Sequence, residues 1–307
     1  MQGKKAALEI SFGWLFAIIA GVIIIFGAIY LSTKIIRTEQ ETISVETGKE
    51  IGILLNPLET SFESAQTTSI TIPAETRINN GCELVGNFGE QLIRLDQKSF
   101  DKWIETNINI RFSNKYIFSN AQIEGKKFFI FSKPFEFPFK IADLMYITSS
   151  KDTYCFISAP DEIEDEISDL SQQNLLTENC SESDIKVCFE SNDCDINVNY
   201  DMKYVEKDND EMYFEGDSLM YAAIFADSET YECQLKRLML RLKEISRLYQ
   251  EKEIFMGEEL CGSNLGWDLN ELSELAGSLE NSEQLEIIAM TADTVSEKND
   301  ARRCMLW

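Results

Sequence analysis

One stretch of the chain, residues 10–33, reads ISFGWLFAIIAGVIIIFGAIYLST and contains no charged side chain. A helix needs roughly 20 apolar residues to cross a bilayer, whereas the apolar part of a secretory signal is only about 7 to 15 residues long. The stretch therefore predicts a transmembrane helix that stays in the mature protein. A buried core helix and a cleaved signal peptide compete with this interpretation. However, a long core helix should show a polar face, and residues 30–33 make a poor small-residue cleavage site.

The rest of the chain divides around this stretch. No proline occurs between residues 10 and 55, so one helix, about 70 Å long, is predicted to cross the membrane and continue as a stalk. The expected fold class is α+β, with a disulfide-braced head behind a single N-terminal transmembrane helix. The expected divisions are a basic leader (1–9), the membrane helix (10–33), the stalk (34–56) and the head (57–307), β-rich over 57–230 and mainly helical over 231–307.

Charges alone do not orient the predicted anchor, because Lys4 and Lys5 on one side face Lys34 and Arg37 on the other. The cysteines favour one orientation. All eight follow the anchor, and none forms a CxxC pair. In an oxidising compartment such a set of cysteines forms a disulfide framework. The alternative is that they are free, buried thiols on the cytoplasmic side. We expect a cytoplasmic N-terminus, an extracytoplasmic head and a tail pinned by Cys304. The disulfide candidates are Cys82, Cys155, Cys180, Cys188, Cys194, Cys233, Cys261 and Cys304.

Composition narrows the chemistry. The chain has no histidine, which excludes catalytic triads of the usual kind and zinc sites with imidazole ligands. Cys180, Cys188 and Cys194 lack the tight spacing of a zinc ribbon, so neither a metal nor another cofactor is expected. A net charge of −25 makes nucleic acid an unfavourable ligand, because phosphate contacts require clustered lysine and arginine. The expected partners are the lipid bilayer and other copies or surface proteins.

The first half of the head is predicted to be rich in strands. Residues 126–140 read KKFFIFSKPFEFPFK, and alternation places Phe135, Phe137 and Phe139 on one side of an extended chain. Such rings form a ligand platform or, more often, part of the core. Pro134 and Pro138 favour an edge strand. Residues 143–157 are predicted to form a hairpin.

Later segments give weaker signals. Residues 160–169 predict a short acidic helix, and residues 184–214 predict strands separated by polar turns. The DNDE run at 208–211 could be a calcium-binding loop, but it lacks the ligand spacing and the glycine of an EF-hand, so a solvated turn is the favoured interpretation. Residues 179–181, Asn-Cys-Ser, match the acceptor motif for N-glycosylation, a pattern that also arises by chance.

The last part of the chain is predicted to be helical. Residues 231–255 place apolar side chains on one stripe, and residues 268–290 give a second helix interrupted near Gly277 and Asn281. Basic side chains on the first helix are a candidate interaction patch for an acidic neighbour, although pairing with the chain's own carboxylates explains them equally well. The candidate patch is Lys236, Arg237, Arg241, Lys243 and Arg247.

The start of the chain resembles a known signal. The sequence from Gly3 to Glu9 reads GKKAALE: basic residues, a small residue and a glutamate just before the apolar stretch. It resembles the class III signal of archaeal type IV pilins and pseudopilins. The resemblance implies cleavage after Ala6, so that Lys5, Ala6 and Ala7 would serve processing and Glu9 filament assembly. Glu9 would be the third mature residue, where the family has its glutamate fifth. The resemblance covers only residues 1–33.

Two functional classes follow. The first is a non-enzymatic surface protein anchored by a single membrane helix, with a structural, adhesive or partner-binding role that includes a pilin-like one. The second is an anchored extracytoplasmic hydrolase that works through two carboxylates as acid and base. The sequence does not single out such a pair among its 53 acidic residues, and it carries no catalytic motif. The first class is therefore the expected one.

Overall fold

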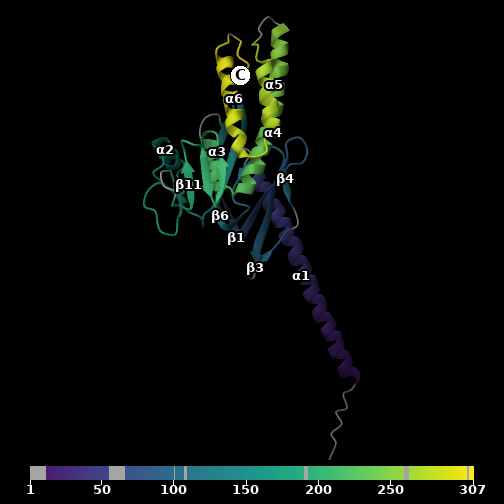
Figure 1. Ribbon diagram of the computed structural model, residues 1–307. Coiled ribbons are helices and arrows are strands. Elements are labelled where there is room, and N and C mark those ends of the chain that lie inside the picture. Colours follow the sequence, from purple (N-terminus) through teal and green to yellow (C-terminus); the bar gives the residue numbers. More distant parts are fainter. Residues whose placement is uncertain are drawn as a thin grey trace, which may run out of the picture.

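The computed structural model describes residues 12–54, 66–99, 101–106, 109–189, 193–258, 263–302 and 304–307. The expected processing residues Lys5, Ala6, Ala7 and Glu9 lie outside the described residues, as do Lys4 and Cys261. The chain has a mixed α+β body from which one long N-terminal helix extends (Figure 1). The expected α+β class is confirmed.

Helix α1 (Phe12–Leu54) is unbroken over 43 residues, which corresponds to about 65 Å. Its stretch Gly13–Ile35 has a mean hydropathy of 2.6 over its most apolar window, of which 0% is buried. By length and composition this stretch fits either a membrane anchor or a signal sequence. Farther along, α1 contacts strands β2 and β4 of the body.

The first sheet has seven strands in the order β3-β2-β1-β6-β7-β5, with β4 also paired to β2. All pairs are antiparallel except β5 with β7. The sheet thus grows mainly by hairpin connections. Its strands are β1 (Gln66–Glu83), β2 (Glu90–Ser99), β3 (Lys102–Ile104), β4 (Ile110–Phe112), β5 (Tyr116–Phe118), β6 (Gln122–Glu136) and β7 (Lys140–Ser149).

The second sheet has six strands in the order β13-β12-β11-β10-β8-β9. Strands β8, β9, β10 and β11 run parallel to one another. Helix α2 (Asp161–Leu170) connects β8 to β9 and confirms the acidic helix predicted over residues 160–169. The β12–β13 hairpin is antiparallel to them. The strands are β8 (Tyr154–Ile157), β9 (Leu175–Leu176), β10 (Ile185–Cys188), β11 (Ile196–Asn199), β12 (Tyr204–Lys207) and β13 (Asp210–Tyr213).

The hairpin expected over residues 143–157 is wrong. A tight turn does follow β7, and the Asp152 N–H donates to the Ser149 carbonyl at 3.1 Å. However, β8 pairs with β9 and β10 in the second sheet instead of folding back on β7. The local turn signal was correct, but partner choice depends on the long-range burial of β8, whose residues Tyr154, Cys155 and Phe156 are all buried.

Helix α3 (Gly216–Phe225) contacts both sheets: β5, β6 and β7 of the first, and β12 and β13 of the second. Every residue from Ser218 to Phe225 is buried. A helix that is apolar on all sides has no face for solvent and must lie inside. The Tyr146 hydroxyl of β7 fixes it further by donating to the Ser218 carbonyl at 2.6 Å.

The C-terminal part contains α4 (Ser228–Glu258), α5 (Gly266–Gly277), the short 3-10 helix η2 (Ser282–Gln284) and α6 (Leu285–Asp300). Figure 1 shows α4, α5 and α6 rising from the body on the side away from the start of α1. The predicted helices are confirmed, and the second one is interrupted where expected. At that point Gly277 lies so close to α4 that a Cβ there would be 2.9 Å from Cδ of Lys243.

Strand β6 supplies both cores of the body. Alternation directs Phe128 and Ile130 into a small core of isoleucines on one face of the first sheet, and Phe131 into the main core around α3 and α4. Phe135, Phe137 and Phe139 also lie in the main core, so these rings are packing residues and form no platform.

The edge position suggested by the prolines is wrong, because β6 lies between β1 and β7. Within the described residues β1 pairs with β6 only as far as Ser132, so Pro134 has a strand partner on one side only. A proline lacks the backbone N–H that pairing with a second strand would use, and no second strand among the described residues pairs with Pro134.

Three disulfides are described: Cys82–Cys233, Cys155–Cys180 and Cys188–Cys194. The first joins β1 to α4 across 151 residues of chain, whereas the last closes a separation of only 6. Cys304 is also disulfide-bonded. The expected framework is confirmed for these cysteines, and the sequence had left its connectivity open.

The C-terminal tail packs against the body. Leu306 is buried, and its N–H donates to Asn299 Oδ1 of α6 at 2.7 Å. The ring of Trp307 lies 5.2 Å from those of both Phe139 and Tyr249, measured between centroids. Cys304 is therefore one of several attachments that hold the end of the chain.

Candidate functional site

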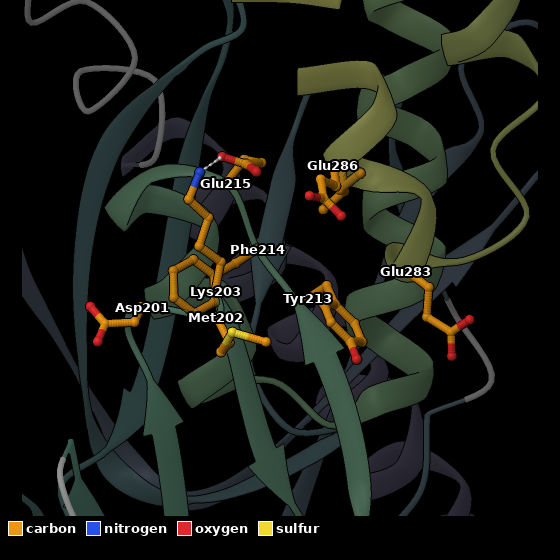
Figure 2. Close-up of a pocket in the computed structure, with 9 residues that line it drawn as sticks. Asp201, Met202, Lys203, Tyr213, Phe214, Glu215, Glu283 and Glu286 are labelled. Atoms are coloured by element: carbon orange, nitrogen blue, oxygen red, sulfur yellow. Dashed lines mark hydrogen bonds and ion pairs between the residues drawn. The ribbon is translucent and has the colours of Figure 1, made fainter. Parts of the chain in front are cut away.

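A pocket of about 260 Å³ opens where the β11–β12 turn and the segment after β13 meet the start of α6 (Figure 2). Tyr213 lies between the strand side of the pocket, with Met202, and the helix side, with Glu283 (Figure 2). Four of the nine lining residues carry a carboxylate, and one carries a positive charge. The residues that line it are Asp201, Met202, Lys203, Tyr213, Phe214, Glu215, Glu283, Leu285 and Glu286.

Hydrogen bonds hold the strand side of the pocket. Asn199 Oδ1 accepts from the N–H of Met202 at 2.9 Å and shapes the turn. Lys203 has a φ of 55°, and its carbonyl accepts from the N–H of Phe214 at 2.9 Å. This turn therefore brings residues 201–203 beside residues 213–215, although the two segments are separated by a whole hairpin.

A second set of contacts attaches the helix side. The Tyr213 N–H donates to Ser282 Oγ at 3.1 Å, and the Ser282 N–H donates to Glu232 Oε2 of α4 at 3.0 Å. Leu285, the first residue of α6, is buried. Strand β13, helix α4 and the η2–α6 junction are thereby fixed together, so the pocket is formed by an interlocked region of the fold.

The electrostatics of the pocket are one-sided. Lys203 Nζ lies 2.7 Å from Glu215 Oε2 and neutralises it. Asp201, Glu283 and Glu286 are exposed, and within the described part of the chain they form no ion pair. The hydrogen bond from Tyr213 to the Glu211 carboxylate raises the pKa of the Tyr213 phenol. Three uncompensated carboxylates beside an aromatic ring suit a positively charged group.

A separate cluster of charges joins α2 and α3 to the first sheet. Lys133 Nζ lies 2.6 Å from Glu166 Oε2 and 3.4 Å from Asp217 Oδ2. The Tyr221 hydroxyl donates to Glu166 at 3.0 Å, and the Tyr200 hydroxyl donates to Asp217 at 3.0 Å. Burial is the main cause that raises the pKa of both tyrosines, and the nearby carboxylates add to it. The pKa of Tyr200 rises to about 12. The two carboxylates share one lysine, which is an arrangement of a structural ion-pair network.

The structure corrects the candidate interaction patch at Arg237. This side chain is 0% exposed and cannot belong to a surface patch. Its Nη1 donates to the Lys115 carbonyl at 2.8 Å and its Nε to the Phe88 carbonyl at 3.1 Å, while its guanidinium lies 4.7 Å from the centroid of the Tyr116 ring. Helical periodicity grouped Arg237 with the other basic residues of the helix. Only the tertiary fold shows that backbone carbonyls enclose its side chain.

The other four residues of the candidate patch contact different parts of the molecule. Arg241 lines a hollow that also contains Asp143, whose pKa is raised by burial. Lys243 packs under Gly277, and Arg247 pairs with Glu244 at 3.1 Å. Lys236 is half-buried. These residues follow one helix but contact different neighbouring elements. Within the described residues only Arg247 among them forms ion pairs with the chain's own carboxylates, Glu244 and Glu274, so internal pairing explains only part of the set.

Sequence reasoning did not find the acidic pocket. Its residues come from three separate segments, and none of them stands in a recognisable motif. The only sequence signal was the general excess of acidic residues, which does not locate a site. Within the described residues no three Cys, Asp or Glu side chains are grouped so that they could hold a metal ion.

The chain matches no family model, and no curated protein or solved structure is significantly similar to it.

Proposed function

We propose that the chain is a single-pass membrane protein whose disulfide-braced head stands outside the membrane on α1 and binds a partner there. Structural, adhesive and pilin-like roles belong to this class. One observation carries the proposal: the apolar stretch Gly13–Ile35 is not packed against the body.

The apolar side chains of this stretch face the outside of the helix and are not covered by the body. The large apolar side chains from Trp14 to Ile35 are between 47% and 70% exposed. Leaving such side chains in water costs on the order of 1 kcal/mol each or more, so the whole stretch costs about as much as a domain's entire stability. A lipid bilayer, or an assembly of such helices, removes this cost.

The disulfides support the placement of the head. Three described bridges plus the bonded Cys304 are typical of an oxidising compartment, and disulfides are rare in cytosolic proteins. With the head outside, the N-terminus is cytoplasmic. The stalk part of α1, about 30 Å long, then separates the head from the bilayer.

The pocket supports the partner-binding role. Its volume of about 260 Å³ accommodates a side chain or a similarly small group, and its uncompensated carboxylates favour a cationic one. A lysine or arginine of a basic partner segment has this chemistry. The pocket offers no buried pair of carboxylates for acid and base catalysis, because Asp201, Glu283 and Glu286 are exposed.

Membrane attachment is tested by washing isolated membranes with alkaline carbonate and measuring how much protein stays in the pellet. An arginine near the middle of the span costs about 3 kcal/mol, so Ile23→Arg with Ile24→Arg should release the protein. Thr33→Arg is the matched control, because an arginine at the end of the span can extend toward water. Release of the unaltered protein by carbonate would contradict the proposal.

The placement of the head is tested on whole cells with an added protease and an impermeant maleimide. The head should be digested without permeabilisation, and its cysteines should become reactive only after reduction. A head that is protected in intact cells and carries reactive thiols would place it in the cytoplasm. Intact mass separates the pilin-like form, whose chain would start at Ala7, from a plain anchored protein that keeps its leader.

A further inference from the structure

The loop between β9 and β10 carries the Asn-Cys-Ser motif at 179–181. Residues 178–183 are all exposed. Asn179 is the only asparagine in the chain that has serine or threonine two residues later. Acceptor asparagines for N-linked sugars lie in surface loops of exported proteins.

The loop is held in place without using the Asn179 side chain. Cys180 is bonded to Cys155, which is fully buried in β8. The Ser181 N–H donates to Asp184 Oδ2 at 2.7 Å, and the Asp184 N–H donates to the Ser181 carbonyl at 3.3 Å. Within the described residues the carboxamide of Asn179 forms no hydrogen bond. A bulky group on its nitrogen would therefore break no side-chain hydrogen bond of the described residues.

We infer that Asn179 is a site of N-glycosylation. The inference rests on the proposed placement of the head outside the membrane. The donor class is an oligosaccharide linked to a lipid phosphate. The Asn179 Nδ2 forms a bond to the anomeric carbon of the sugar, the bond from that carbon to the phosphate oxygen breaks, the amide gives up one proton, and the lipid phosphate leaves with the electron pair.

A structural reason also exists for asparagine here. Asn179 has a φ of 58°, and asparagine tolerates this left-handed region better than most residues. That reason does not require Ser181 at the third position. The two explanations therefore differ in what they demand of Ser181, and variants at both positions separate them.

The test is mass spectrometry on protein purified from the cells that naturally make it, after reduction, alkylation and trypsin digestion. Cleavage after Lys151 and Lys186 gives one peptide, residues 152–186, that contains the motif. In the unaltered protein it should carry an added glycan mass on Asn179. Ser181→Thr keeps the motif and should keep the glycan, whereas Ser181→Ala should lose it. Asn179→Asp keeps a residue that tolerates the backbone conformation and should also lose the glycan.

The outcomes are distinguishable from a failure of the proposed function. An unmodified peptide from a head that is accessible outside the cell overturns glycosylation and leaves the surface placement standing. An unmodified peptide from a head that is protected in intact cells contradicts both. A glycan that persists in Asn179→Asp would show that another residue is the acceptor, and one that stays on Asn179 in Ser181→Ala would show that the motif does not direct it; either result would overturn the inference.

Discussion

Cys82 of β1 is bonded to Cys233 of α4 one helical turn before Arg237, the buried side chain that five backbone carbonyls surround. A covalent link and a polar anchor thus attach the same stretch of α4 to the same edge of the body. Because α4 contacts α5, and α5 contacts α6, this attachment also connects the C-terminal helices to the body.

The disulfides should differ in their contributions to stability. In the chain-entropy model, the bridge across 151 residues contributes about 5 kcal/mol and the bridge across 6 about 2 kcal/mol. Cys82→Ser with Cys233→Ser should therefore lower the free energy of unfolding more than Cys188→Ser with Cys194→Ser. Urea unfolding monitored by circular dichroism measures both. Equal losses would mean that loop length does not decide the effect here.

Arg237 should be far less replaceable than its surface neighbour Arg247. Arg237→Met leaves buried carbonyls without a donor and should cost about 3 to 5 kcal/mol. Arg247→Met removes a side chain that is 46% exposed and pairs with the exposed carboxylates of Glu244 at 3.1 Å and Glu274 at 4.0 Å, and should cost under about 1 kcal/mol. Thermal unfolding of the two variants gives the comparison. Similar melting temperatures would contradict the anchoring role of Arg237.

Two glycines of the β1–β2 turn provide a matched pair. Both have positive φ, 72° at Gly86 and 63° at Gly89. A Cβ at Gly86 would meet no atom within 4 Å, whereas at Gly89 it would lie 2.7 Å from the Glu83 carbonyl oxygen. Gly86→Ala should cost only the conformational penalty of about 1 kcal/mol, and Gly89→Ala clearly more. Equal unfolding midpoints in urea would argue against this close approach.

Buried tyrosines should make the fold sensitive to alkali. Burial raises the pKa of Tyr221, as it does for Tyr146 and Tyr231, above the value of about 10 of an unfolded chain. Above pH 10 the unfolded chain releases phenol protons that the folded chain retains, so stability falls as pH rises, by up to about 1.4 kcal/mol per pH unit per group.

The variant Tyr221→Phe removes one of these groups and should reduce that slope. Urea unfolding at a series of pH values between about 9.5 and 11 measures it. At pH 7 the same variant loses only the hydrogen bond to Glu166. A slope identical to that of the unaltered protein would mean that Tyr221 does not retain its proton in the folded state.

The acidic pocket should bind a short fluorescent lysine peptide in a salt-dependent manner. Asp201→Asn with Glu283→Gln and Glu286→Gln should weaken binding about tenfold or more, since each exposed charge contributes up to about 1 kcal/mol. Fluorescence anisotropy measures the affinity. The control removes three exposed carboxylates outside the pocket: Glu271→Gln with Asp293→Asn and Glu297→Gln. Equal weakening in both triple variants would indicate a general attraction to an acidic surface.

Local patterns in the sequence predicted much of the fold. The apolar stretch, the acidic helix and the break at Gly277 all depend on neighbouring residues, and they were found. Features that depend on distant partners were not. Pro134 suggested an edge strand because a proline lacks an N–H, but β6 lies between β1 and β7, and its pairing with β1 in the described residues begins at Ser132. Likewise, the sequence did not show that β8 joins a second sheet.

The candidate site was less predictable, for a similar reason. Arg237 has the same helical spacing as its exposed neighbours, and only the turn before β2 and the segment after β4 decide that it is buried. The pocket combines the β11–β12 turn with a helix start more than 70 residues later. No local spacing connects Met202 with Glu286.

Helix α3 also constrains the order in which the molecule can be completed. Both sheets pack against it, yet it follows every described strand of both sheets in the chain. A nascent chain that stops before Phe225 would leave two apolar sheet faces uncovered. The body can therefore close into a protease-resistant fold only after synthesis has passed Phe225, and fragments that end earlier should be digested readily.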